Sequence, residues 1–369
     1  MKPSPKIAVA VAVACAALAA PGAAAAAQST NTVFVQNDNK AGNQVVAYHR
    51  ASDGTLTQTG VFGAGGLGGQ LEGSVADHLG SQGSLAYDGA DNLLFAVNAG
   101  SDTVAVFGVH GSRLALRQDI SSYGEFPVSV TAGDGRLYVL DAAGGGTVQG
   151  YAIRDGRLVA IAGAHLNLDL PEEAPQFVHT PGDISLEPGG ANLIVTTKAT
   201  TNSVDVIPVG LDGSLSAPVV NEEPGTVPFA VAYDREGHVL VAEAGGYLAA
   251  FEAAESGELR QLDSVATNQA ATCWLTEARG HFYTSNAGSS TLTAFSSADG
   301  GNVLTDLGNT ETDAGTVDAA AVPGGRFLYV QTGVAGNVDE FEVAHSGALT
   351  RIGSVTVPGA AGGEGVAVG

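Results

Sequence analysis

A turn motif repeats along the chain and constrains its fold more than any other feature of the sequence. A short turn of the Asp-Gly, Ser-Gly or Gly-Ser type is followed two or three residues later by a leucine or valine, and this arrangement occurs seven times. The apolar positions are Leu56, Leu114, Leu158, Leu215, Leu259, Val303 and Leu349. Their intervals are 58, 44, 57, 44, 44 and 46 residues, so the basic period is 44 to 46 residues and two units carry insertions. The insertions are visible as the glycine-rich segment 63–82 and as segment 166–181.

Each unit carries the pattern of four short strands. In the second unit these are residues 85–88, 94–98, 104–107 and 114–120, which have alternating or continuous apolar character. The third strand of each unit ends on a large apolar or aromatic residue: Tyr48, Phe107, Tyr151, Ile207, Phe251, Phe295 and Phe341. Four antiparallel strands repeated seven times predict an all-β fold, a seven-bladed β-propeller. A pair of stacked β-sandwiches is the alternative, but it gives no reason for a seven-fold period.

The two ends of the chain predict how the ring closes. The first unit begins at residues 33–35, which match the second strand of other units, so its innermost strand is missing. The tail at residues 364–368 resembles the innermost strands at residues 84–87 and 229–232. We therefore expect the C-terminal strand to complete the first blade, which leaves no open sheet edge in the ring.

The first 27 residues have the features of an export signal. Lys2 and Lys6 precede the uncharged apolar run 7–20, and small residues precede Gln28. We expect a signal peptide at 1–27, a single propeller domain at 28–369, and a secreted or periplasmic location. Lipid modification of Cys15 is an alternative, although this cysteine comes too early and would leave apolar residues on the mature chain.

The mature chain has neither a disulfide nor a second apolar segment of membrane-spanning length. Removal of the signal leaves Cys273 as the only cysteine, so no internal disulfide can form. No other stretch reaches the roughly 18 apolar residues that a membrane span requires. We expect no membrane association after the signal is removed, and a stability that comes from the apolar core.

The charge balance excludes two classes of partner. The chain has 15 Lys and Arg against 38 Asp and Glu, a formal net charge of −23. Binding to nucleic acid requires clustered cations, and binding to an anionic membrane surface requires a basic face. The expected partner is therefore a small molecule in the central funnel of the propeller, and we expect the protein to be a monomer.

In a propeller, the starts of the inner strands and the loops between second and third strands share one face, around the channel. This face gathers loops from every blade and is the default ligand site. The second strands are expected to place there Asn37, Asn98, Asp141, Thr197, Lys198, Glu243, Asn286 and Thr332. The inner strands and nearby loops add Ser84, Asp183, Cys273, Trp274, Asp318, Glu364, Asp77, His78 and His179. Most arginines fall on the opposite face, so the funnel is predicted to be rich in oxygen and poor in cations.

Four of these residues are candidate metal ligands. Asn98, Asp141, Glu243 and Asn286 lie on different blades and, if they converge, offer the carboxylate and amide oxygens that a divalent cation such as calcium prefers. The alternative is that polar residues at strand ends cap loops and join neighbouring blades by hydrogen bonds. No contiguous calcium-loop motif is present.

Four residues are candidates for catalysis. His179, with Asp183 or Glu364 as partner, is a candidate general base for a water that attacks an ester. Lys198 is the one cation expected in the funnel, where it can hold an oxyanion or balance the surrounding acids. The alternative for His179 is a solvated loop histidine that only forms hydrogen bonds.

Cys273 and Trp274 begin an inner strand. Cys273 is a nucleophile only if a base and an electropositive setting lower its pKa, so a buried structural cysteine is the favoured interpretation. Trp274 is the only tryptophan of the chain. It either stacks on a ring ligand or plugs the channel, and the sequence does not separate these roles.

Several sequence segments resemble those of the seven-bladed propeller lactonase-like family, which includes bacterial 6-phosphogluconolactonases of the propeller type and fungal carboxymuconate cyclases. The segments are DNLLFAVNAGSDTVAVF at 91–107, PFAVAYD at 228–234 and GRFLYV at 325–330. Similarity to exported bacterial members lies in DHLGSQGSL at 77–85, TTKATTNSVDV at 196–206 and TCW at 272–274. The resemblance implies a propeller fold and hydrolysis of a lactone.

The chain departs from the family at the catalytic segment. Phosphogluconolactonase-type members usually carry a Pro-His-x-His segment, and its places fall here on residues 179–182, where both histidines are absent and His179 stands in the place of the proline. A phosphorylated lactone also requires cations for its phosphate, and the funnel offers little beyond Lys198. We therefore expect an exported hydrolase of an unphosphorylated lactone or cyclic ester. The alternative is a non-catalytic propeller that binds a ligand or protein through the funnel or segment 63–82.

Overall fold

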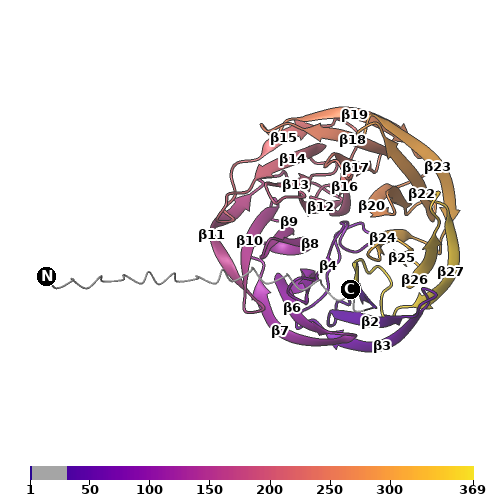
Figure 1. Ribbon diagram of the computed structural model, residues 1–369, viewed down its shortest axis with the longest axis horizontal. Coiled ribbons are helices and arrows are strands. Elements are labelled where there is room, and N and C mark those ends of the chain that lie inside the picture. The colour runs from indigo at the N-terminus through magenta and orange to yellow at the C-terminus, as the bar shows by residue number, and fades with distance from the viewer. Residues whose placement is uncertain (2–30) are drawn as a thin grey trace.

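The chain forms a ring of seven four-stranded antiparallel sheets around a central channel (Figure 1). This computed structural model describes Met1 and residues 31–369. The predicted signal peptide at 1–27 lies outside the described residues apart from Met1. The predicted seven-bladed propeller is confirmed, and no helix in the described residues is long and apolar enough to cross a membrane.

The strands of each blade follow one another outward from the channel. Blade 1 contains β28 (Val366–Val368), β1 (Thr32–Gln36), β2 (Gln44–Arg50) and β3 (Leu56–Gly63). Blade 2 contains β4 (Leu85–Asp88), β5 (Leu93–Asn98), β6 (Thr103–His110) and β7 (Arg113–Ser121). Blade 3 contains β8 (Glu125–Gly133), β9 (Arg136–Ala143), β10 (Thr147–Arg154) and β11 (Arg157–Asn167). Blade 4 contains β12 (Asp183–Leu186), β13 (Asn192–Thr196), β14 (Ser203–Pro208) and β15 (Val219–Glu222).

The remaining three blades have the same order. Blade 5 contains β16 (Pro228–Tyr233), β17 (Val239–Glu243), β18 (Tyr247–Ala253) and β19 (Leu259–Ala266). Blade 6 contains β20 (Thr272–Ala278), β21 (His281–Asn286), β22 (Thr291–Ala298) and β23 (Val303–Glu311). Blade 7 contains β24 (Thr316–Ala321), β25 (Phe327–Thr332), β26 (Asn337–Val343) and β27 (Leu349–Thr356). Two short 3-10 helices, η1 (Ala99–Ser101) and η2 (Gln176–Val178), lie in the loops.

The repeated turn joins the third and fourth strands of every blade, as the period predicts. Its glycine has a positive φ in all seven units, which an L side chain rarely adopts. At Gly54, where φ is +92°, an added Cβ would also lie 2.5 Å from the ring of Phe327 in the neighbouring blade. The turn is therefore fixed both by its backbone conformation and by contact between blades.

The large residues near the end of the third strand form the contacts between blades. All seven are at most 1% exposed, and full burial of such a side chain stabilises a fold by roughly 1.5–3 kcal/mol. In six blades the ladder between the third and fourth strands shifts its register at this residue, as it does at Tyr48 and Phe251. Such an irregularity increases the local twist of the outer strands.

The C-terminal strand closes the ring. Strand β28 pairs antiparallel with β1, with Val366 opposite Val35 and Val368 opposite Val33. The amide of Gln36 also donates to the carbonyl of Gly365 at 2.8 Å. The predicted closure is confirmed, and blade 1 is built from both ends of the chain.

Candidate functional site

Residues 71–83, which we call the crossing segment, occupy the face where the funnel was expected. The Trp274 indole N–H donates to the carbonyl of Ser81 at 2.6 Å, and the Leu275 amide donates to Oε1 of Gln82 at 2.8 Å. The amide of His78 donates to the carbonyl of Gly362 at 2.8 Å. The segment thus contacts blade 6 and the closing end of the chain, and its loop lies inside the ring before β4 (Figure 1). The expected funnel is therefore covered, because the first insertion folds inward rather than outward.

Lys198 holds the crossing segment. Its Nζ donates to the carbonyls of Gly80 at 2.6 Å and Phe177 at 2.7 Å, and to Oγ1 of Thr180 at 3.0 Å. Burial lowers its pKa to about 7, partly opposed by the charge of Asp77. All three ammonium hydrogens have protein acceptors and the side chain is 1% exposed. These contacts do not support the expected role of Lys198 in polarising a substrate carbonyl, and instead make it a residue that ties both insertions together.

Asp183 is buried at the start of β12. Its Oδ1 accepts from the Ser129 hydroxyl at 3.2 Å, and its Oδ2 accepts from the Val231 amide at 2.9 Å. Burial raises its pKa to about 7. No contact between Asp183 and His179 is found, so this predicted pair is not brought together.

Glu364 lies immediately before the closing strand and is fully buried. Its Oε1 accepts from the amides of Gly83 at 2.9 Å and Ser84 at 3.4 Å. Burial, with the charge of Asp318 next, raises its pKa well above the usual value. Like Asp183, Glu364 does not contact His179.

His179 lies instead beside a small cavity of about 240 Å³ on the same face. The cavity is lined by the second insertion, the loop between β9 and β10, and Glu72 of the crossing segment. Nδ1 of His179 is 3.4 Å from Oε2 of Glu173, and the histidine side chain is 19% exposed. Thr180, which Lys198 contacts, lines the cavity as well. The lining contains three glutamates and no lysine or arginine.

The four predicted metal ligands are each used within or beside their own blade. The amide nitrogen of Asn98 donates to Oγ1 of Thr103 at 3.1 Å, and that of Asn286 donates to Oγ1 of Thr293 at 2.9 Å. Oδ2 of Asp141 accepts from the Thr147 hydroxyl at 2.8 Å. Burial raises the pKa of both Asp141 and Glu243 to about 7. No hydrogen bond among the described residues joins any two of the four. The contacts of Asn98, Asp141 and Asn286 are those of the loop-capping alternative.

Cys273 and Trp274 are structural. Burial raises the pKa of the Cys273 thiol to about 12, and the residue is 8% exposed. The Trp274 ring packs against Phe229 with centroids 5.0 Å apart. The bond from its N–H to Ser81 places Trp274 against the crossing segment.

A second, larger cavity opens at the opposite mouth of the channel, which the sequence did not indicate. It has a volume of about 770 Å³ and lies where the inner strands of blades 5, 6 and 7 end, at Tyr233, Glu277 and Ala321. Arg235 and Arg279 line it together with four acids, which agrees with the prediction that arginines gather on this face.

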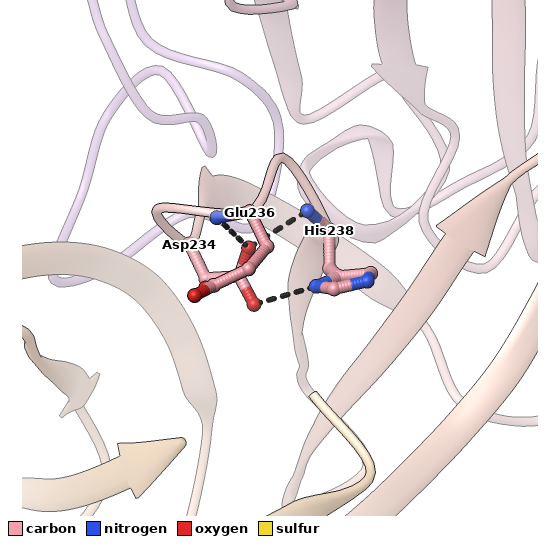
Figure 2. A group of neighbouring side chains, drawn as sticks. All are labelled: Asp234, Glu236 and His238. Atoms are coloured by element: carbon pink, nitrogen blue, oxygen red, sulfur yellow. Dashed lines mark hydrogen bonds and ion pairs between the residues drawn. The ribbon is translucent and has the colours of Figure 1, made fainter. Parts of the chain in front are cut away.

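One side-chain cluster at this mouth has the composition of a metal site: Asp234, Glu236 and His238 (Figure 2). Oδ1 of Asp234 accepts from the amides of Glu236 at 3.0 Å and His238 at 2.8 Å. Its Oδ2 lies 2.8 Å from Nδ1 of His238. These bonds fix the turn between β16 and β17, and Glu236 is exposed. The cluster is explained by its turn.

Two residues of these sites were missed by the sequence analysis. Asp38 lies one residue past the expected second-strand end at Asn37. Its carboxyl group is buried, and burial raises its pKa to about 7. Glu173 lies in the second insertion, which has no counterpart in other blades. A search for acidic residues close to His179 in the sequence would have found Glu173, but it would not have shown that Glu173 contacts the histidine ring.

No family model matches the chain, and no curated protein matches it significantly. Solved structures with the same fold include a periplasmic gluconolactonase from Pseudomonas aeruginosa, at 17% identity and a TM-score of 0.72 over 92% of this chain and 99% of that chain. A candidate 6-phosphogluconolactonase from Bacteroides uniformis aligns at 15% identity and a TM-score of 0.73 over 91% and 98%. These neighbours are consistent with the resemblance to lactonase-like propellers.

The fold is shared more widely than the lactonases. A chain of the nidogen–laminin complex aligns at 15% identity and a TM-score of 0.51, over 74% of this chain and 96% of that chain. At such identities the likeness shows the propeller fold alone, since propellers host unrelated functions.

Proposed function

We propose that the protein is an extracytoplasmic hydrolase of an unphosphorylated lactone or small cyclic ester, and that its site is the cavity beside His179. The observation that carries the proposal is the Glu173–His179 pair at the edge of a cavity of about 240 Å³. The two groups are at ion-pair distance and form no hydrogen bond in this structure. A carboxylate close to one ring nitrogen of a histidine is the arrangement that general-base catalysis uses once the hydrogen bond forms.

The chemistry follows from the orientation of the histidine. Because Nδ1 faces Glu173, Nε2 is the nitrogen that takes a proton from water. The water oxygen attacks the ester carbonyl as its proton passes to Nε2, and the Glu173 carboxylate stabilises the imidazolium that forms. Collapse of the tetrahedral intermediate then breaks the ring C–O bond, and the imidazolium returns the proton to the leaving alkoxide. Lys198 acts as a positioning residue, because its bonds to Phe177 and Thr180 hold the segment that carries His179.

The charge of the lining supports the substrate class. Glu72, Glu172 and Glu173 line the cavity without any lysine or arginine. A phosphate group would be repelled there, whereas a neutral ring would enter, and the carboxylate of the product would be driven out. The likeness to the gluconolactonase fold agrees with this reaction type but does not select the substrate.

The purified protein should be assayed on paired lactones with and without a phosphate group, each in the presence and absence of chelator. We expect turnover of the unphosphorylated member and loss of that turnover in His179→Ala. His110→Ala is the matched control, because His110 is an exposed histidine at the end of β6. Absence of turnover on every lactone contradicts the hydrolase, and full activity of His179→Ala contradicts the assigned base.

A binding protein is the second candidate function. The cavity of about 770 Å³ at the opposite mouth favours it, because its size is typical of ligand sites and its two arginines and four acids offer both donors and acceptors. Binding of a polar ligand that Arg279→Ala weakens, in a protein without turnover, would support this function.

A further inference from the structure

Four buried carboxyl groups gather where the crossing segment meets the closing end of the chain. They belong to Glu364 before β28, Asp318 in β24, Asp38 after β1 and Asp77 in the crossing segment. Each of the four residues is at most 5% exposed. Hydrogen bonds place three of them around one another. Oδ2 of Asp38 accepts from the Glu364 amide at 2.9 Å, and Oδ2 of Asp318 accepts from the Val366 amide at 3.0 Å.

Neutral donors satisfy the aspartates of this cluster. Asp77 accepts from the amides of Leu79 at 2.7 Å and Ser81 at 2.8 Å. Asp318 also accepts from the Ala319 amide at 2.8 Å, and Asp38 from the side chain of Gln36 at 2.5 Å. Amide donors orient these carboxyl groups but carry no formal charge to balance them.

Glu364 differs from the aspartates, because its second oxygen has no donor. Oε1 accepts from Gly83 and Ser84, whereas Oε2 is buried without a hydrogen-bond partner. The Glu364 backbone amide donates to Asp38, and the Val366 amide donates to Asp318, so Glu364 lies beside both aspartates. The charges of Asp318, Asp77 and Asp38 act on its carboxyl group. A buried oxygen that is left unsatisfied is costly, and more so when it is charged.

The protein supplies too little positive charge for four carboxylates. Among the described residues, no lysine, arginine or histidine forms an ion pair with any of them. Lys198 interacts with Asp77 through its charge, but its hydrogens are bonded to Gly80, Phe177 and Thr180. A divalent cation held by oxygen ligands would supply the positive charge that balances the carboxylates.

We propose that Glu364 and Asp318 bind one hard divalent cation at the junction of blades 1 and 7, with Asp38 and Asp77 contributing charge around it. Carboxylate oxygens are the ligands that Ca²⁺ prefers, and Ca²⁺ is the probe ion. The ion would join the closing strand β28 to the crossing segment, because Glu364 already contacts Gly83. The site is distinct from Asn98, Asp141, Glu243 and Asn286, and it does not depend on the proposed hydrolase.

The test is calorimetric titration of the chelator-treated protein with Ca²⁺. We expect one ion per chain, with a dissociation constant at or below the range of about 10⁻⁴ to 10⁻³ M typical of extracellular sites. Glu364→Gln should weaken binding by about tenfold or more, since it keeps the shape and removes the charge. Glu340→Gln is the matched control, because Glu340 is a buried glutamate that accepts from the Leu56 amide and has no bond to the cluster, and it should bind as the wild type does.

Thermal melting gives a second measurement. Ca²⁺ should raise the melting temperature of the wild type and of Glu340→Gln, because an ion that binds only the folded state stabilises it. If Glu364→Gln fails to fold, Asp318→Asn replaces it. The proposal is overturned if the wild type binds no Ca²⁺ at about 10 mM, or if Glu364→Gln and Asp318→Asn bind it with unchanged affinity. In either case protons alone occupy the cluster.

Discussion

The amide of Gly83 donates to Oε1 of Glu364 at 2.9 Å, although 281 positions separate the two residues in the chain. This bond joins the end of the crossing segment to the residue that precedes the closing strand. Ring closure and coverage of the channel are therefore parts of one structure. Because that structure lies at the expected funnel, His179 lies beside the cavity of the second insertion and not in an open funnel.

Replacing Glu173 tests the orientation of the proposed base. In Glu173→Gln the negative charge that stabilises the His179 imidazolium is removed. We therefore expect kcat on a hydrolysed lactone to fall by about tenfold or more, with a smaller change in KM. Glu255→Gln, an exposed glutamate in the turn between β18 and β19, serves as the control. An equal effect of both substitutions on kcat would remove the Glu173–His179 pair from the mechanism.

Stability should fall as pH rises from about 4 to about 7. Burial raises the pKa of Asp183 from 3.8 to about 7, so the folded state binds its proton more tightly than the unfolded state. The stabilisation is complete below the unfolded pKa and is lost as pH rises through the folded pKa. A shift of this size corresponds to an effect on the order of 4 kcal/mol. Urea titrations at pH 4.5 and 8 should show the trend, and Asp183→Asn should reduce it. A stability that rises over this range contradicts the prediction.

The turn glycines offer a matched pair of substitutions. Gly54→Ala introduces a methyl group at a φ of +92° and within 2.5 Å of the Phe327 ring, whereas Gly111→Ala has a φ of +61° and no neighbour within 4 Å. We expect Gly111→Ala to cost about 1 kcal/mol from the backbone alone. Gly54→Ala should cost about 1–3 kcal/mol more, because it also overpacks the contact between blades. Denaturant unfolding measures both, and equal losses would show that the blade contact does not matter.

Periodicity explains which parts of the structure were predictable from the sequence. The turn glycines and residues such as Phe251 and Phe295 recur in every unit, so the blade count, the strand order and the closure by β28 could all be derived. Glu173 and Ser81 lie in insertions that occur once, where no repeat indicates the fold of the backbone. The placement of Asp183 and Glu364 near the channel was predicted, but the segment that covers them was not.

Cys273 should be unreactive in the folded protein. The residue is 8% exposed, and burial raises the pKa of its thiol to about 12, so almost no thiolate is present at neutral pH. A disulfide reagent such as dithionitrobenzoate should therefore modify the native protein slowly and the urea-unfolded protein fully. Lys198→Met should increase the native rate, because it removes the bond to Gly80 and loosens the segment above Trp274. Rapid reaction of the native wild type would show that the channel is open at this end, and an unchanged rate in Lys198→Met would show that Lys198 does not control it.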